Sequence, residues 1–202
     1  MAGYLIKDMT KEERHDGEED FFDEVGEGKR KDGLYGNLFI LGDKHMSEFE
    51  RLKEVVARLR AEDGCPWDRE QTHKSLKPEC IEEAAEVICG INILEETGNA
   101  DNLKEELGDL LLQVVMHAQI AEEEGLFTME DVCRGISEKM IRRHPHVFGN
   151  DTVNDSGEVL TKWADIKKQE KAGKEWTESY LPGAFDEAKE LIDVAKKRKG
   201  FE

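Results

Sequence analysis

Apolar residues recur at helical spacing along most of the chain after residue 46, and no other feature of the sequence constrains the fold as strongly. No stretch of strand length there alternates apolar and polar residues, so the pattern gives no support to a sheet. The spacing therefore predicts an all-α fold with helices over residues 47–61, 78–97, 101–125, 128–144, 158–172 and 184–199.

Local signals set the expected ends of these helices. Ser47 and Thr128 each begin a capping-box pattern, in which the side chain of the cap bonds to the first turn. Gly98 stops the second helix, and Asp101 is expected to cap the third. Residues 64–75 contain turn-forming and polar residues and are expected to form a connection.

The chain divides into two parts by composition. Residues 1–45 mix glycine with charge and predict an acidic, flexible N-terminal extension, with one short apolar patch at residues 38–41. Residues 46–202 predict one folded helical domain. We expect this domain to have a four-helix-bundle-like core with additional C-terminal helices. We also expect dimerisation with a second chain to complete this bundle.

The formal net charge of −18 excludes several classes of function. Sequence-independent binding of nucleic acid needs Lys and Arg to displace counterions from phosphates, and an anionic membrane surface is disfavoured for the same reason. The sequence has neither an apolar run of 18 residues nor the apolar core of a signal peptide, so we expect a cytoplasmic protein. Its four cysteines have no CxxC spacing, which gives no support to a zinc site.

The negative charge is concentrated in residues 79–131, which carry 15 acidic residues and one basic residue. Two consecutive helices there each place acidic residues three or four apart on one face. Further along each helix the same face becomes apolar, which predicts that the carboxylates lie at the mouth of a bundle interior. The acidic residues concerned are Glu82, Glu83, Glu86, Glu106 and Asp109.

A divalent cation would stabilise this set of carboxylates, because oxygen ligands favour Mg²⁺, Mn²⁺ or Ca²⁺ over zinc or copper. The alternative is an ordinary solvated face of an amphipathic helix. A di-iron site would need Glu-x-x-His pairs on two of these helices, and residues 79–131 contain none, since Val114 stands three positions before His117. Basic residues follow the acidic segment, at Lys139, Arg143 and Lys167. They are candidates to bind the phosphates of a substrate, although a solvated basic face would look the same.

Several motifs together resemble the MazG nucleoside triphosphate pyrophosphohydrolases. The acidic pattern EExxE followed by ExxD is similar to the metal motif of that family, whose relatives include the dimeric deoxyuridine triphosphatases and the phosphoribosyl-ATP pyrophosphohydrolases. The flanking stretches agree: GCPWDREQTHKSL at 64–76, KMIRRHPHVFGN at 139–150 and the tail at 181–201. The resemblance covers about residues 46–202.

The resemblance implies roles for individual residues. Glu83, Glu86, Glu106 and Asp109 would bind Mg²⁺, with Mn²⁺ as a substitute, and Glu82 would join them as a ligand or, like Glu83, take a catalytic part by activating water. Phosphates would contact Lys139, Arg143 and Lys167, and the base would lie near Trp163, Trp67 and His73. Packing between helices explains the two tryptophans equally well.

The implied reaction is Mg²⁺-dependent hydrolysis of a (deoxy)nucleoside triphosphate to the monophosphate and pyrophosphate, which would suit the clearing of non-canonical nucleotides. The implied assembly is a homodimer. Two alternatives stay open: a non-catalytic helical module that binds nucleotides or a protein partner, and the same chemistry on phosphoribosyl-ATP or deoxyuridine triphosphate.

Overall fold

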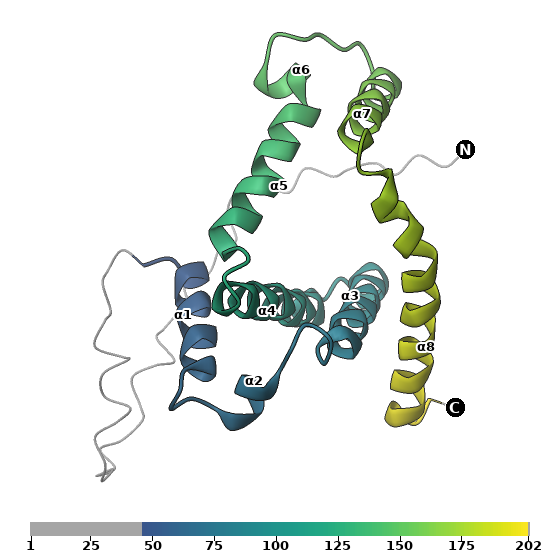
Figure 1. The fold of residues 1–202 in the computed structure, drawn as a ribbon. Coiled ribbons are helices and arrows are strands. Elements are labelled where there is room, and N and C mark those ends of the chain that lie inside the picture. Colours follow the sequence, from purple (N-terminus) through teal and green to yellow (C-terminus); the bar gives the residue numbers. More distant parts are fainter. Residues whose placement is uncertain (1–45, 202) are drawn as a thin grey trace, which may run out of the picture. The chain divides into compact units, whose positions relative to one another are not determined.

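The computed structural model describes residues 46–201, and every regular element in that range is a helix (Figure 1). This confirms the all-α prediction. The expected flexible extension over residues 1–45, with its apolar patch, lies outside the described residues. The elements are α1 (Glu48–Arg60), α2 (Pro66–Glu70), α3 (Lys77–Thr97), α4 (Asp101–Glu123), α5 (Met129–Arg143), α6 (Pro145–Phe148), α7 (Ser156–Lys171), the 3₁₀ helix η1 (Glu175–Tyr180) and α8 (Leu181–Lys199).

Both predicted capping boxes form. At the start of α1, the Ser47 hydroxyl accepts a hydrogen bond from the Glu50 amide, and the Glu50 carboxylate accepts one from the Ser47 amide. Thr128 and Asp131 make the same reciprocal pair at the start of α5. These bonds satisfy amide groups that would otherwise lack a partner at a helix start, so they fix where the two helices begin.

The most extensive packing in the described chain joins α3 to α4. Gly90 makes this close approach possible, because a Cβ atom at that position would lie 2.8 Å from the Cα atom of Leu103. Gly98 ends α3 in the left-handed region, with φ at 76°, as predicted. Asp101 is the first residue of α4 and not its cap: Ala100 holds the cap position, and the Asn99 side chain accepts from the Asp101 amide.

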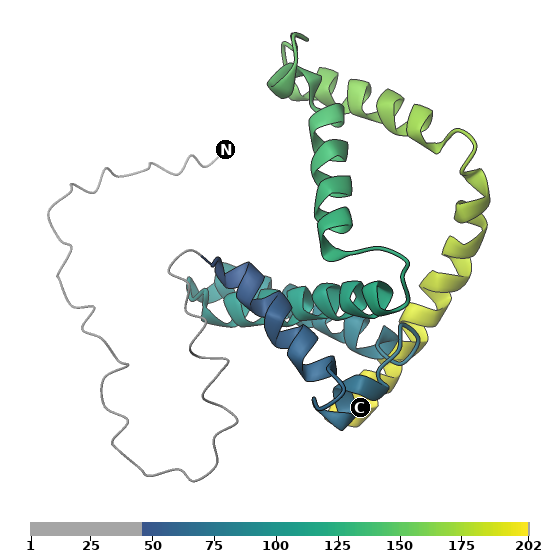
Figure 2. The same ribbon diagram turned by 60° about the vertical axis from the view of Figure 1, so that its left-hand side comes forward.

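The buried core lies where α1 packs on α4. Val56 of α1 is fully buried against Val115, Met116 and Ile120 of α4, and Leu76, which precedes α3, completes the cluster. Figures 1 and 2 both show α1 beside α4, and α8 beside α3, in agreement with the contacts. The long helices α3 and α4 are therefore held from both sides, which fixes the position of the acidic residues they carry.

Three short helices were not predicted. The helix α2 lies inside the stretch expected to be a connection, α6 follows α5 directly, and η1 precedes α8. Each is too short to show a helical period, and α2 and α6 begin at a proline, which the first turn tolerates. The helices α7 and α8 also begin two and three residues earlier than predicted, at Ser156 and Leu181. Among residues 46–201, no helix combines the length and the apolar character that a bilayer span requires.

Candidate metal centre

Three of the five predicted acidic residues come together between α3 and α4. Glu83 of α3 and Glu106 and Asp109 of α4 each offer a carboxylate oxygen, and these oxygens lie within 4.8 Å of one another. Glu106 and Asp109 share a face of α4 because they are three residues apart, and the close packing of α3 brings Glu83 to that face. Carboxylate oxygens from two helices thus surround a space of the size that one cation needs.

The charges of this cluster repel one another. Burial raises the pKa of the Glu83 carboxyl above its ordinary value, and the nearby charges of Asp109 and Glu106 raise it further. Within residues 46–201, no lysine or arginine makes an ion pair with any of the three residues. A set of oxygen ligands without a counter-charge suits a hard divalent cation such as Mg²⁺ or Mn²⁺. The residues present therefore fit the predicted metal.

Asn102 orients one of the carboxylates. Its side-chain amide donates a hydrogen bond to Glu106 Oε1, with the two atoms 2.7 Å apart, and both residues lie on α4, one turn apart. Glu106 is only 9% exposed, so this bond restrains a carboxylate that has little freedom to move. Such an outer partner is what usually positions a metal ligand. Asn102 was not predicted as a site residue, although its position four residues before Glu106 indicates that the two side chains share a face of the helix.

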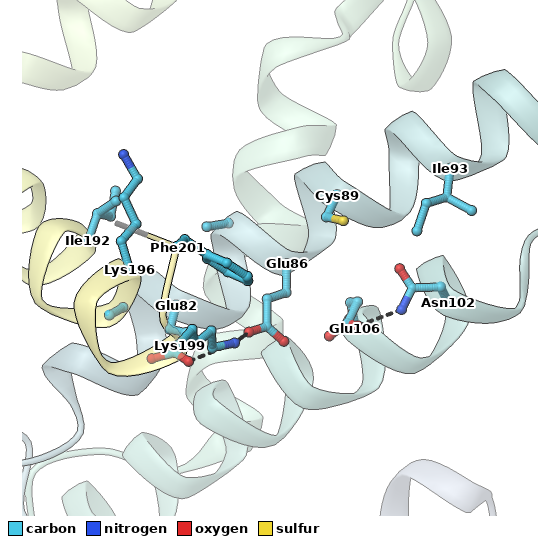
Figure 3. Close-up of a pocket in the computed structure, with 12 residues that line it drawn as sticks. Glu82, Glu86, Cys89, Ile93, Asn102, Glu106, Ile192, Lys196, Lys199 and Phe201 are labelled. Atoms are coloured by element: carbon cyan, nitrogen blue, oxygen red, sulfur yellow. Dashed lines mark hydrogen bonds and ion pairs between the residues drawn. The ribbon is translucent and has the colours of Figure 1, made fainter.

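Glu82 and Glu86 are paired with the end of α8 and are not among the three residues whose carboxylate oxygens converge. Arg198 bonds to Glu82, and Lys199 bonds to both glutamates, with Lys199 Nζ 2.9 Å from Glu82 Oε1 (Figure 3). The hydrogen bond from Lys199 lowers the pKa of the Glu82 carboxyl, against the opposing effect of burial. Arg198 and Lys199 were not predicted as site residues, since a basic run at a helix end is ordinarily explained by the helix dipole.

The predicted phosphate-binding residues form a separate group between α5 and α7. The Arg143 guanidinium lies 5.9 Å and the Lys167 ammonium 5.3 Å from the centre of the Trp163 ring. Arg143 is also paired with Glu170, at 2.9 Å from Nε to the carboxylate. The Trp163 indole N–H is buried without an acceptor. Lys139 lies on the same helix as Arg143, one turn earlier.

Within the described residues of a single chain, this basic group is not linked to the acidic cluster. No hydrogen bond, ion pair or ring contact in residues 46–201 links Lys139, Arg143, Trp163 or Lys167 to the acidic cluster. Two of the predicted base-binding residues also have different surroundings: Trp67 is 61% exposed on α2, whereas His73 stacks on His117 of α4 with ring centres 5.1 Å apart. The structure thus brings together subsets of the predicted site and leaves the subsets separate.

The comparisons with known proteins identify the segment that holds the acidic cluster. Residues 71–148 match the model of the MazG nucleotide pyrophosphohydrolase domain. The chain is 55% identical over 126 residues to the nucleoside triphosphate pyrophosphohydrolase/pyrophosphatase MazG of Thermotoga maritima, a stretch that covers 62% of this chain and 46% of that protein. It is 47% identical over 130 residues to the nucleoside triphosphate pyrophosphohydrolase of Escherichia coli, covering 64% of this chain and 48% of the other.

A third relative carries a less specific name. The chain is 54% identical over 124 residues to the uncharacterized protein YabN of Bacillus subtilis, covering 61% of this chain and 24% of that protein. The chain therefore spans about half the length, or less, of the curated relatives it matches. The matched family segment contains all five acidic residues of α3 and α4. Residues 71–148 of this chain are therefore similar to the MazG nucleotide pyrophosphohydrolase domain, in the family model and in the two relatives that carry the name of this activity.

Proposed function

We propose that this chain hydrolyses nucleoside triphosphates to the monophosphate and pyrophosphate, with a divalent cation held by Glu83, Glu106 and Asp109. The observation that carries the proposal is the convergence of these three carboxylates, without a counter-charge, inside the segment that matches the MazG family. The names of the Thermotoga maritima and Escherichia coli relatives support the same reaction. A role in clearing non-canonical nucleotides would be one use of this chemistry.

We assign different roles to the five acidic residues of α3 and α4. When bound, Mg²⁺, or Mn²⁺ in its place, neutralises phosphate charge and lowers the pKa of water, which is the chemistry this reaction requires. Glu83, Glu106 and Asp109 hold the cation, and Glu86 is the predicted fourth ligand. We assign to Glu82, which precedes Glu83 on α3, the acceptance of a proton from the attacking water, and this role requires that Glu82 leave its ion pairs with Arg198 and Lys199.

Substrate phosphates need cations, and the predicted ones are Lys139, Arg143 and Lys167. We propose that they act within a homodimer, since a single chain leaves them without contact to the acidic cluster. A dimer is supported by exposed apolar side chains on α3 and α4, of which Ile88 is 60% and Leu107 50% exposed. Large apolar side chains that stay exposed on two packed helices are candidates for burial by a second chain. Trp163, Trp67 and His73 remain the predicted contacts of the base.

The test is a panel of ribonucleoside and deoxyribonucleoside triphosphates incubated with the full chain and Mg²⁺, with both products identified. The panel includes deoxyuridine triphosphate and phosphoribosyl-ATP, which decides between the substrate classes left open. We expect pyrophosphate and monophosphate in equal amounts, and none when EDTA removes the cation. Release of single phosphates, or no product from any substrate, would contradict the proposal and favour a non-catalytic module that binds nucleotides.

Variants connect the reaction to the cluster. Glu83→Gln and Asp109→Asn remove one ligand charge each while preserving size, and both should abolish pyrophosphate release. Glu95→Gln is the matched control, because Glu95 lies exposed on α3 and takes part in none of the ion pairs of residues 46–201. Full turnover in both cluster variants would show that the reaction does not use this site.

A further inference from the structure

The last turn of α8 supplies the cations that contact the predicted acidic residues. In residues 46–201, Arg198 and Lys199 are the basic residues paired with any of the five, and they contact Glu82 and Glu86. These residues are more than 110 positions apart in the chain, with separations of 116 and 113 for the two closest bonds. The contact therefore depends on the packing of α8 against α3, and a local helix-end effect does not explain it.

The neighbouring lysines show what an ordinary helix end looks like. Lys197 makes no ion pair among the described residues, and Lys196 approaches only Asp193 of its own helix, at 4.0 Å. Both suit the negative end of the α8 dipole and nothing more. Glu82, by contrast, is 8% exposed, so its bonds to Arg198 and Lys199 are shielded from solvent on the carboxylate side. Shielded, charge-assisted bonds of this kind are strong and specific.

A cavity opens where these cations meet the acidic residues. It has a volume of about 410 Å³, within the range of small-molecule pockets, and it lies between α3, α4 and α8. Figure 3 shows Glu86 and Glu106 on one side of it and the Lys199 ammonium reaching across to Glu86. Glu106 also belongs to the three-carboxylate cluster, so the cavity adjoins the candidate metal centre.

Lys199 and a bound cation would compete for Glu86. A carboxylate that ligates a metal gives up most of its attraction for an ammonium group, so Lys199 and Arg198 need new anionic partners once the metal centre is filled. A triphosphate that enters the cavity supplies such partners, since its phosphate oxygens carry several negative charges. Among residues 46–201, the basic group around Trp163 makes no hydrogen bond or ion pair with Glu82 or Glu86.

We propose that Arg198 and Lys199 bind the phosphates of the nucleoside triphosphate, after releasing Glu82 and Glu86 to the metal centre. This role rests on the proposed function and adds two substrate-binding residues to it. In the absence of substrate, the same two cations neutralise the two carboxylates that they contact.

The test compares Lys199→Met with the control Lys197→Met, which removes an equal charge from the same turn. Isothermal titration calorimetry measures the binding of Mn²⁺ alone, and of tripolyphosphate with Mn²⁺ present. We expect Lys199→Met to bind tripolyphosphate about tenfold more weakly than the control, the effect of one lost charge-assisted bond. It should bind Mn²⁺ alone at least as tightly as the control, because Glu86 loses its competitor. Lys199→Arg should restore tripolyphosphate binding.

The other outcomes overturn the proposal. If Lys199→Met binds Mn²⁺ more tightly and tripolyphosphate as before, Arg198 and Lys199 only form ion pairs with the carboxylates and do not bind phosphates. Equal weakening of both ligands, together with lost helicity, would make them a structural link between α8 and α3. The proposed function fails separately, if the unmodified chain binds tripolyphosphate and releases no pyrophosphate from any nucleotide.

Discussion

Asn102 donates a hydrogen bond to Glu106 across one turn of α4, with 2.7 Å between the amide nitrogen and the carboxylate oxygen. The bond leaves the second oxygen of Glu106 available to the cluster that it forms with Glu83 and Asp109. A bond of this kind turns a flexible side chain into an oriented ligand. Asn102 therefore belongs to the metal centre although it does not itself have to touch the cation.

Replacing Asn102 tests this positioning role. Asn102→Ala removes the donor and should weaken the binding of Mn²⁺ by roughly tenfold or more, the usual cost of losing an outer partner of a metal ligand. Calorimetry in parallel with a pH profile of binding provides the measurement. Asn102→Gln, which keeps a donor amide, should recover part of the loss. Unchanged affinity in the alanine variant would show that Glu106 is oriented without this bond.

Glu83 should reduce stability when no cation is bound. Its pKa is raised in the folded chain, so its contribution to stability is fully present below the unfolded pKa and is lost as the pH rises through the folded pKa. At neutral pH the charged form is therefore penalised. In EDTA, Glu83→Gln should be more stable than the unmodified chain by about 0.5 kcal/mol, the size of a like-charge repulsion. Urea unfolding measures the difference.

Adding Mg²⁺ should reverse that order. The unmodified chain gains stability from binding, whereas the Glu83→Gln chain gains little because it has lost a ligand. If Glu83→Gln were less stable than the unmodified chain in EDTA, the repulsion argued for this cluster would be absent. The Glu95→Gln control should behave like the unmodified chain under both conditions.

His117 predicts a pH dependence of stability on the acid side. Burial lowers the pKa of His117, and the neighbouring His73 lowers it further; the carboxylate of Glu124 lies 3.8 Å from the other side of the His73 ring. A histidine with a lowered pKa stays neutral in the fold, so its contribution to stability is present above the unfolded pKa and is lost as the pH falls through the folded pKa. Between about pH 7.5 and 5.5, His117→Gln should lose less unfolding free energy than the unmodified chain. Parallel curves of unfolding free energy against pH for the two proteins would show that His117 does not cause this pH dependence.

The apolar surface of α3 and α4 predicts self-association. Ile88 is 60% exposed on α3, and Ile88→Glu should shift the chain from dimer to monomer in light scattering, because it places a charge in an apolar contact. Leu160→Glu is the matched control, since Leu160 is also 60% exposed but lies on α7. A monomeric unmodified chain, or equal dissociation of the two variants, would contradict an interface formed by α3.

Sequence patterns predicted the long helices well, because each is long enough to show its period and carries a recognisable start or stop. The capping boxes at Ser47 and Thr128 and the stop at Gly98 are local features, and the structure confirms them. The single-turn helices were missed because they contain no full period. The helices α2 and α6 each begin at a proline, but a proline alone does not predict a helix, because prolines also occur in connections.

The part of the candidate site that could be predicted is the part set by spacing within a helix and by the pairing of consecutive helices. Glu106 and Asp109 share a face by their separation alone, and the pairing of consecutive helices brings Glu83 to them. The contact of Arg198 and Lys199 with α3 depends on where α8 docks, and no local pattern encodes that. The same limit explains why Trp67 and His73, which the resemblance placed together near the base, lie in different surroundings.

The central claim is that Glu83, Glu106 and Asp109 hold the divalent cation of the reaction. Anomalous diffraction from crystals grown with Mn²⁺ and a nonhydrolysable nucleoside triphosphate tests it most directly. We expect an anomalous peak at about 2.1–2.3 Å from oxygens of all three carboxylates, the coordination distance of a hard divalent cation, with phosphate oxygens among its other ligands. A peak bound elsewhere, with these three side chains facing solvent, would contradict it.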